Sequence, residues 1–227
     1  MARNVRHQAS SSTAQRAQTR LRDMILAGEL AAGTDHLESE LAERLEMSRT
    51  PVREACVLLQ GRGLLEVRPR KGVRILPVSP ADMEEIYDVL TELETLAARK
   101  AAEAGLPERA LAPLTRALDD METALAADDR AAWADADQRF HHELVRLGGN
   151  RRAMDIVEMM SDQVARARQT TLYMRPAPDR SNADHRAVLD AIRAGDAGRA
   201  AARHRAHRQY AKAMLIELLK THRLSNL

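Results

Sequence analysis

The stretch from Leu37 to Ile75, LESELAERLEMSRTPVREACVLLQGRGLLEVRPRKGVRI, decides the fold of the first third of the chain. Leu37, Leu41 and Leu45 recur at the spacing of one helix face, which predicts a short helix. A second helix follows closely, and its buried stripe repeats at the same helical spacing through Val52, Ala55, Cys56 and Leu59. The two helices are separated only by a short turn.

A basic hairpin is predicted after these two helices. The runs LLEV at 64–67 and VRIL at 73–76 are prone to form strands, and RPRKG joins them. The preceding stretch STAQRAQTRLRDMIL also has the periodicity of a helix. Three helices followed by a hairpin are typical of a winged helix-turn-helix, which we expect over residues 13–77, behind a disordered tail at residues 1–12.

Two arginines at the start of the second helix of the quoted stretch indicate what this domain binds. Arg49 and Arg53 are four residues apart, so they share a helix face, where like charges cost a few tenths of a kcal/mol. A bidentate contact between arginine and guanine in the major groove offers about 1–3 kcal/mol of discrimination. We therefore expect double-stranded DNA contacts from Ser39, Ser48, Arg49, Thr50, Arg53, Arg70, Lys71 and Gly72.

The rest of the chain is predicted to be helical throughout. Pro77 and Pro80 mark the boundary, and we expect an all-α bundle over residues 78–227. Turn signals divide it into helices at about 80–104, 107–127, 130–147, 151–174, 180–194 and 196–222. The predicted fold class is therefore mainly α, with a small β-hairpin in the N-terminal domain.

Composition and charge agree with a helical, DNA-binding chain. Aromatic residues are only 2% of the 227 residues, which argues against β-sandwiches and against stacking platforms for single strands. Residues 1–77 hold 13 Lys and Arg against 9 Asp and Glu, whereas the remainder holds 22 against 24. The positive end is a candidate for binding a polyanion. Cys56 is the only cysteine, so no disulfide forms within one chain.

A second constellation of residues lies in the helical half. Asp137 and His141 are four residues apart and project from one face of a helix, while His185 and His207 stand on later helices. One carboxylate and three imidazoles suit a divalent Zn, Ni, Mn or Fe ion in a bundle core. Scattered histidines often have no shared role, so the residues alone leave this site open. His204, in an arginine-rich run, is expected to face solvent.

The quoted stretch resembles the DNA-binding domain of the GntR family of bacterial transcription regulators over residues 14–77. The core SRTPVRE carries the resemblance. The family usually has glycine where Glu46 stands, so Glu46 would be strained if that position needs a positive φ. The resemblance implies that the chain binds a palindromic operator as a homodimer, most often as a repressor.

The helical half resembles the FCD ligand-binding domain found in one GntR subfamily. LETLAARKAAE, DQRFHHEL and DHRAVLDAIRAGDAGRAAARHRAH carry this resemblance. Many FCD domains bind a divalent metal through an aspartate, a histidine four residues later and two further histidines. The resemblance therefore implies metal ligation by Asp137, His141, His185 and His207, and an effector that is a small organic acid.

Two other readings stay open from the sequence. The first is a metal-dependent hydrolase or lyase fused to a DNA-binding module, although no general base or nucleophile motif accompanies the site, so we expect no enzyme. The second is an architectural DNA binder that needs no effector. The chain lacks a signal-like N-terminus and any run of 18 apolar residues, so we expect no membrane association and a cytoplasmic protein that joins the nucleoid when bound to DNA.

Overall fold

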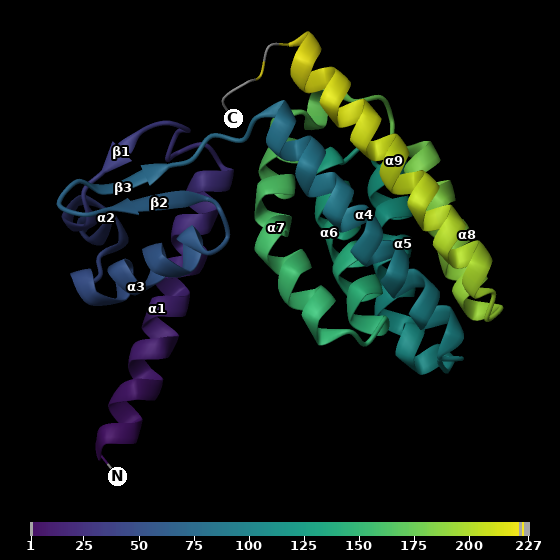
Figure 1. Cartoon of the computed structure of the whole chain (residues 1–227), viewed down its shortest axis with the longest axis horizontal. Coiled ribbons are helices and arrows are strands. Elements are labelled where there is room, and N and C mark those ends of the chain that lie inside the picture. Colours follow the sequence, from purple (N-terminus) through teal and green to yellow (C-terminus); the bar gives the residue numbers. More distant parts are fainter. Residues whose placement is uncertain (1, 223, 225–227) are drawn as a thin grey trace. The chain divides into compact units, whose positions relative to one another are not determined.

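The computed structural model describes residues 2–222 and Leu224, with side chains described from Thr13 onward. The chain divides into two compact units, one up to Ser79 and one from Pro80 to Leu224. Each unit has a core of its own, and each is described here by itself (Figure 1).

The N-terminal unit contains three helices and a small antiparallel sheet. Its elements are α1 (Ala2–Leu26), β1 (Asp35–His36), α2 (Glu38–Leu45), α3 (Arg49–Gln60), β2 (Leu65–Arg68) and β3 (Gly72–Ile75). The strands are ordered β1-β3-β2, with Val67 opposite Val73 and Asp35 opposite Arg74. The predicted winged helix-turn-helix architecture is therefore confirmed. The short strand β1 was not predicted, because the residues before Leu37 carry turn signals.

Helix α1 is longer than the sequence predicts. It begins at Ala2, so the structure differs from the disordered tail expected over residues 1–12, although the side chains of residues 1–12 lie outside the described part. The C-terminal end of α1 is closer to expectation. The helix ends at Leu26, and Gly28 follows with φ +78°, a left-handed conformation that glycine adopts without steric cost.

The core of the N-terminal unit is built from the stripes seen in the sequence. Leu41 and Leu45 of α2 are buried, as is the α3 stripe of Val52, Ala55, Cys56 and Leu59. They pack with Leu21 and Ile25 of α1 and with Val73 and Ile75 of β3. This core fixes which face of α3 is turned away from the unit, and Arg49 and Arg53 lie on that exposed face.

Glu46, which follows α2, has a left-handed backbone conformation, as expected at a position where the GntR family usually has glycine. Its φ is 55° and its ψ is 42°, and its backbone N–H donates to the carbonyl oxygen of Glu43. A residue with a Cβ pays roughly 1–2 kcal/mol for this conformation. The turn between α2 and α3 therefore holds local strain at Glu46.

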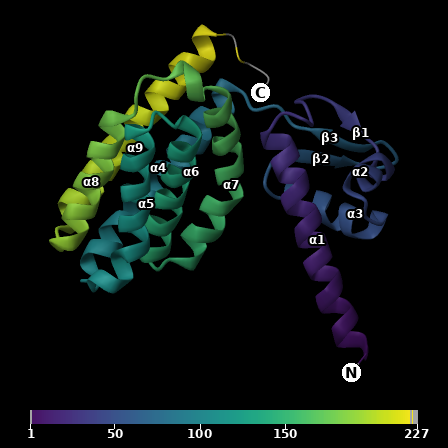
Figure 2. The same ribbon diagram turned by 180° about the vertical axis from the view of Figure 1, so that it is seen from behind.

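The C-terminal unit is an all-α bundle. Its elements are α4 (Pro80–Glu103), α5 (Glu108–Ala126), α6 (Arg130–Leu147), α7 (Arg151–Thr170), the 3-10 turn η1 (Leu172–Met174), α8 (Asp179–Arg193) and α9 (Ala197–Thr221). The predicted helices match these bounds within a few residues. The exception is the predicted helix at 151–174, which ends at Thr170 and continues as η1. Figures 1 and 2 show α9 running alongside α4 and α8, the helices with which it makes close contact.

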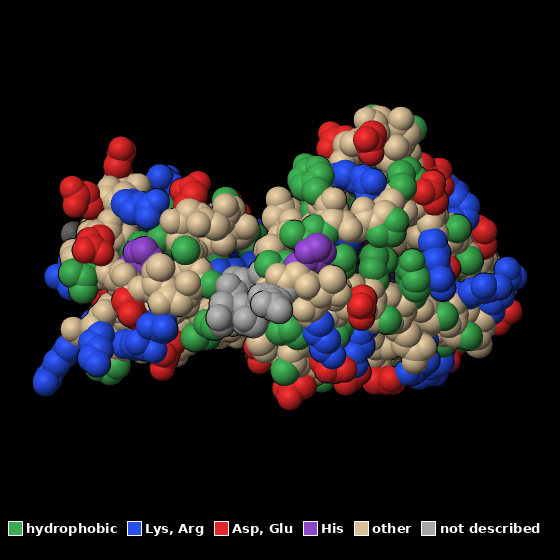
Figure 3. Space-filling view, turned by 90° about the horizontal axis from the view of Figure 1, so that it is seen from above, with side chains coloured by type: hydrophobic (Ala, Val, Ile, Leu, Met, Phe, Trp, Pro, Cys, Tyr) green, Lys and Arg blue, Asp and Glu red, His purple; other side chains and the backbone are tan. Residues whose placement is uncertain are grey.

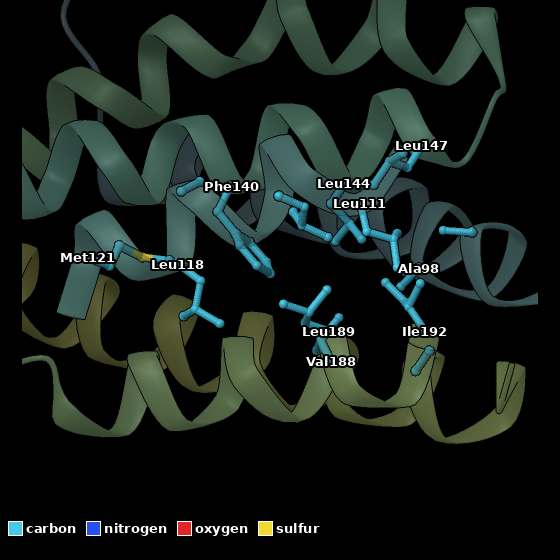
Figure 4. Close-up of a cluster of buried hydrophobic side chains, with 14 of the residues drawn as sticks. Ala98, Leu111, Leu118, Met121, Phe140, Leu144, Leu147, Val188, Leu189 and Ile192 are labelled. Atoms are coloured by element: carbon cyan, nitrogen blue, oxygen red, sulfur yellow. The ribbon is translucent and has the colours of Figure 1, made fainter. Parts of the chain in front are cut away.

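An apolar cluster fills one side of this bundle. Phe140 and Leu144 of α6 pack with Leu118 and Met121 of α5 and with Leu189 of α8 (Figure 4). At the end of α6, Gly148 lies so close to α4 that an added Cβ would be 2.6 Å from the Cα of Ala97. The apolar cluster and the close approach of Gly148 to α4 together fix the relative positions of α4, α6 and α8.

The surface of the larger unit is charged. Figure 3 shows acidic and basic side chains interspersed over the visible face of this unit. Among the described residues, no helix is both long enough and apolar enough to cross a membrane.

Candidate functional site

The start of α3 presents the predicted DNA-reading side chains to solvent. Ser48, Arg49, Thr50 and Arg53 are all exposed, and 72% of the Arg53 side chain is accessible. Arg53 lies 3.9 Å from Glu38, a long ion pair that restrains it little. Ser39, in the first turn of α2, is also exposed. An exposed helix N-terminus bearing guanidinium groups suits both phosphate and base edges.

The hairpin tip presents cations that could contact the DNA backbone. Arg70 has φ 65° and is exposed together with Lys71. Gly72 has φ 83°, and a Cβ there would lie 2.1 Å from the carbonyl oxygen of His36, so only glycine fits. Asp35 of β1 pairs instead with Arg74, at 3.0 Å. The cations at the tip are therefore left to solvent, where a phosphate could meet them.

In the C-terminal unit, three helices direct the predicted metal-binding side chains into one buried cluster. Asp137 and His141 come from α6, His185 from α8 and His207 from α9. Asp137 and His185 are fully buried, and His141 and His207 nearly so. The structure thus brings together all four residues named from the sequence as a metal set.

The three histidines of this set lie close together, and Asp137 lies beside two of them. The Nε2 atoms of His141 and His185 are 3.4 Å apart, and each lies 3.7 Å from an oxygen of Asp137. Nitrogen atoms of His141, His185 and His207 all lie within 4.8 Å of one another. The His185 and His207 rings are 4.3 Å apart between centroids. This is the spacing of donors around a single ion.

Glu94 of α4 orients one of these histidines and was missed from the sequence. His141 Nδ1 donates to Glu94 Oε2 at 2.8 Å, because an ionised carboxylate can only accept. His141 Nε2 is therefore left with a free lone pair, directed toward His185. Carboxylate–histidine pairs of this kind fix the ring of a metal ligand and raise its basicity. Glu94 interrupts an apolar stripe that includes Leu90 and Ala97, and that interruption was the available sequence signal.

His204 also belongs to this buried network, so the prediction that it faces solvent is wrong. Its side chain is fully buried, and its Nε2 donates to Glu94 Oε2 at 3.0 Å. The error has a clear cause, since arginines surround His204 in the sequence while its own face of α9 packs against α4. His142, in contrast, is 51% exposed and lies outside the cluster, as predicted.

The two carboxylates of the cluster are held ionised. Burial would raise the pKa of Asp137, but Arg168, whose Nη2 lies 2.5 Å from Asp137 Oδ2, and then His141 and His185 lower it to about 2. Burial likewise acts to raise the pKa of Glu94, and Arg208 and His141 outweigh it, so that the pKa lies well below its ordinary value. Both groups are therefore anions at neutral pH.

His185 and His207 are kept neutral by their surroundings. Burial lowers the pKa of His185 and that of His207 well below the ordinary value, and neighbouring positive charge adds to the effect. Neutral imidazole is the form that binds metal. Both ring nitrogens of His207 and the Oδ1 oxygen of Asp137 have no hydrogen-bond partner although they are buried, whereas Asp137 Oδ2 contacts Arg168. Buried polar atoms without partners are costly, and a cation would satisfy them. The residues present therefore fit a divalent metal.

Family comparisons agree with both units. Residues 13–75 match the bacterial regulatory proteins of the gntR family, and residues 85–210 match the FCD domain. The chain is 43% identical, over 55% of its length and 74% of the relative's, to an uncharacterized HTH-type transcriptional regulator of Agrobacterium vitis. It is 28% identical to the HTH-type transcriptional repressor RspR of Escherichia coli K12, over 74% of each chain.

The fold is also found among solved structures. The E. coli protein McbR/YncC superimposes with a TM-score of 0.77 at 22% identity, covering 91% of this chain and 98% of the other. Both domains of the sequence match known families in the same order. The chain therefore belongs to the GntR family of bacterial regulatory proteins, in the group that carries an FCD domain, and is a DNA-binding transcriptional regulator rather than an enzyme.

Proposed function

We propose that this chain is a repressor that binds a palindromic operator as a homodimer and responds to a small organic acid at a metal centre. The metal would be a divalent Zn, Ni, Mn or Fe ion held by Asp137, His141, His185 and His207. The relative RspR is named as a repressor, which supports the direction of control. Two-fold symmetry follows from the half-site read by one winged helix.

One observation carries the metal part of this proposal. Nitrogen atoms of three histidines lie within 4.8 Å of one another, and the buried carboxylate of Asp137 lies 3.7 Å from two of them, on helices far apart in sequence. Side chains that merely filled space would have their buried polar atoms paired, yet both ring nitrogens of His207 have no hydrogen-bond partner. When bound, the metal would supply coordination positions at which an effector carboxylate can replace water.

The operator part rests on the exposed start of α3 and on the hairpin tip. Arg49 and Arg53 are proposed to read base edges, with Ser48 and Thr50 beside them. Arg70, Lys71 and Gly72 are proposed to contact the DNA backbone or minor groove, and Ser39 a phosphate. Phosphate contacts position the protein, while base-edge contacts supply the preference for one sequence.

An architectural DNA binder without an effector is less well supported. Such a protein would have no use for a converging set of ligands, and splayed side chains at these positions would favour it. In this chain the four side chains meet in the bundle, and Glu94 orients one of them.

Elemental analysis and operator titration together test the proposal. The purified protein is expected to hold one divalent metal per chain, and added organic acids are expected to shift operator affinity only when the metal is present. A coupling of about 1–3 kcal/mol is the usual scale, and DNA must change acid affinity by the same factor. If the protein held no metal and its operator affinity did not change with any added acid, the proposed metal centre and effector would be wrong. The proposed operator contacts would not be affected.

A further inference from the structure

The buried cluster contains more positive charge than its carboxylates can balance. Arg168, Arg175 and Arg208 lie in or beside it, and Asp137 and Glu94 are the carboxylates that act on them. The charges of these five groups sum to +1. A divalent metal would raise that to +3 in an interior where unpaired charge is expensive.

Other charged groups near the cluster do not change this balance. Arg166 and Asp162 are both buried on α7 and carry opposite charges. Asp184 lies 3.6 Å from His207, but Arg180 lies 3.8 Å from Asp184 and offsets it. The excess therefore remains on the three arginines named above.

Arg175 is the arginine whose charge is least compensated. Its Nη2 and Nε donate to one acceptor, Thr171 Oγ1, at 2.7 and 3.1 Å. None of the ion pairs among the described residues includes it. Burial, followed by the like charge of Arg168, lowers the pKa of Arg175 to about 10. A guanidinium presents five donors in a fork that matches a carboxylate, and most of them are unused here.

Tyr87 adds a neutral donor to the same place. Its side chain is fully buried, yet its hydroxyl has no hydrogen-bond partner. The ring lies 4.5 Å from the guanidinium carbon of Arg208, and the hydroxyl is close enough to Arg168 and Arg175 to influence their pKa values. A buried hydroxyl without a partner destabilises the folded protein, and an added acceptor would satisfy it.

The position of these groups distinguishes them from the metal ligands. Arg168 lies near the end of α7 and Arg175 just beyond η1, and both side chains are only partly buried. His185 and His207 are closed off from solvent. The side chains of Arg168 and Arg175 are therefore less enclosed than the two histidines, and Arg168 contacts Asp137 at the edge of the cluster.

We propose that Arg168, Arg175 and the Tyr87 hydroxyl form a second anion subsite, so that the effector is a small acid with two carboxylates. This inference rests on the function proposed above. One carboxylate would bind at the metal and the other at the arginines. A dianion brings the charge of the site from +3 to +1, whereas a monoanion leaves it at +2. The geometry thereby selects diacids over monoacids of the same length.

Matched probes test this selection on the full-length, metal-loaded protein. Titration calorimetry compares succinate with succinamate, which replaces one carboxylate by an amide, and extends to malonate, glutarate, malate and citrate against butyrate and lactate. At least one diacid is expected to bind about tenfold or more tightly than the monoacids, because a lost charged hydrogen bond costs roughly that factor or more.

Variants test whether Arg175 and Tyr87 cause the preference for diacids over monoacids. R175Q is expected to weaken the diacid at least about tenfold and to leave monoacid affinity nearly unchanged, so the preference collapses. Y87F is expected to weaken the diacid several-fold. The matched control is R152Q, because Arg152 lies on the same helix α7 as Arg168 with its side chain 92% exposed. R152Q should keep the wild-type preference.

Metal content and operator affinity, measured on the same samples, identify which idea fails. Equal binding of diacids and monoacids, a preference that survives in R175Q, or no diacid binding to metal-loaded protein would each overturn the second subsite alone. R175Q should retain its metal and its operator affinity, and the loss of either would mean that Arg175 is structural. A wild-type protein that binds no metal would overturn the subsite and the proposed metal centre together.

Discussion

The Nε2 atoms of His141 and His185 lie 3.4 Å apart, and each is 3.7 Å from Asp137. His141 Nδ1 already donates to Glu94, so its Nε2 offers a lone pair toward the other ring. Because His141 Nε2 is an acceptor, the contact is satisfied either by the Nε2–H tautomer of His185 or by a cation between the two nitrogens. Burial lowers the pKa of His185, which favours the neutral ring that a metal ion requires.

The first prediction concerns the metal ligands. H185A and H207A are each expected to lower the metal content well below one equivalent per chain, because each removes one of the converging nitrogens. Elemental analysis after dialysis measures this directly. H142A serves as the control, since that exposed side chain should have no effect. Full occupancy in both buried-histidine variants would show that the ligands are assigned wrongly.

The second prediction concerns Glu94, which contacts His141 and is not one of the four proposed ligands, although Glu94, His141 and His204 also place potential ligand atoms close together. E94Q keeps the shape of the side chain but removes the charge that holds His141 Nδ1. Metal affinity is expected to fall about 10- to 100-fold, as for other lost partners of metal-bound histidines. H204A should have a smaller effect in the same direction, since His204 acts only through Glu94. Competition with a chromogenic chelator gives the affinities, and an unchanged value in E94Q would exclude the orienting role.

The third prediction concerns operator recognition. R49A and R53A are each expected to weaken specific binding by about 1–3 kcal/mol and to blur the preference at one guanine. K71A should weaken binding to all DNA sequences alike. It should also reduce the slope of log affinity against log salt concentration by about 0.9 per lost phosphate contact. Fluorescence anisotropy over a salt series separates the two patterns. R99A removes the same charge from the exposed side of α4, so it serves as the control and should bind operator DNA like the wild type.

The fourth prediction concerns the strained turn before α3. E46G is expected to stabilise the N-terminal unit by about 0.5–1 kcal/mol, because glycine adopts φ 55° without a Cβ clash and this gain exceeds its added chain entropy. Urea unfolding followed by circular dichroism measures the change. The control, E43G, places glycine in the interior of α2 and should destabilise by about 1 kcal/mol. Destabilisation in both variants would mean that the Glu46 side chain itself is needed.

The fifth prediction concerns alkaline stability. Burial, and then Glu38, raise the pKa of the Cys56 thiol from its ordinary value of 9.0 to about 12. The unfolded chain therefore loses this proton above about pH 9, while the folded chain keeps it. The stability from the neutral thiol is complete below pH 9 and is lost as the pH rises toward 12, at about 1.4 kcal/mol per unit.

Comparison with C56A isolates this contribution from the other groups that titrate in the same range. The difference in unfolding free energy between wild type and C56A should shrink steadily from pH 9 upward. A difference that stays constant from pH 8 to 11 would show that the thiol does not titrate as described. Below pH 9, Cys56 should also resist alkylation until the chain is unfolded.

Most of the fold could be predicted because its signals are local. The apolar stripe of α3, the turn residues between helices and the basic tip between β2 and β3 each depend on neighbours a few residues away. Strand β1 escaped prediction because it has only two residues, and its pairing with β3 is decided by the folded sheet. The break after Thr170 escaped for a similar reason, since it replaces a continuous helix by the η1 turn.

The candidate site was predictable only in part. Asp137 and His141 are linked by helical spacing, and resemblance to a family supplied His185 and His207. The groups around them, Glu94 and His204, are brought together across 110 residues of sequence by the packing of α4 against α9. Periodicity reports which face of a helix is buried, but it does not report which charged group lies opposite. Arg175 was missed because it lies outside any regular helix.

The separate cores of the two units have a consequence for how the protein is made. The winged helix buries its own apolar residues up to Ile75, whereas the polar cluster is complete only when His207 of α9 is in place. During synthesis the N-terminal unit can therefore fold before most of the C-terminal unit has been made. A nonsense mutation in the second half of the gene would leave a folded winged helix without the polar cluster, rather than no protein at all.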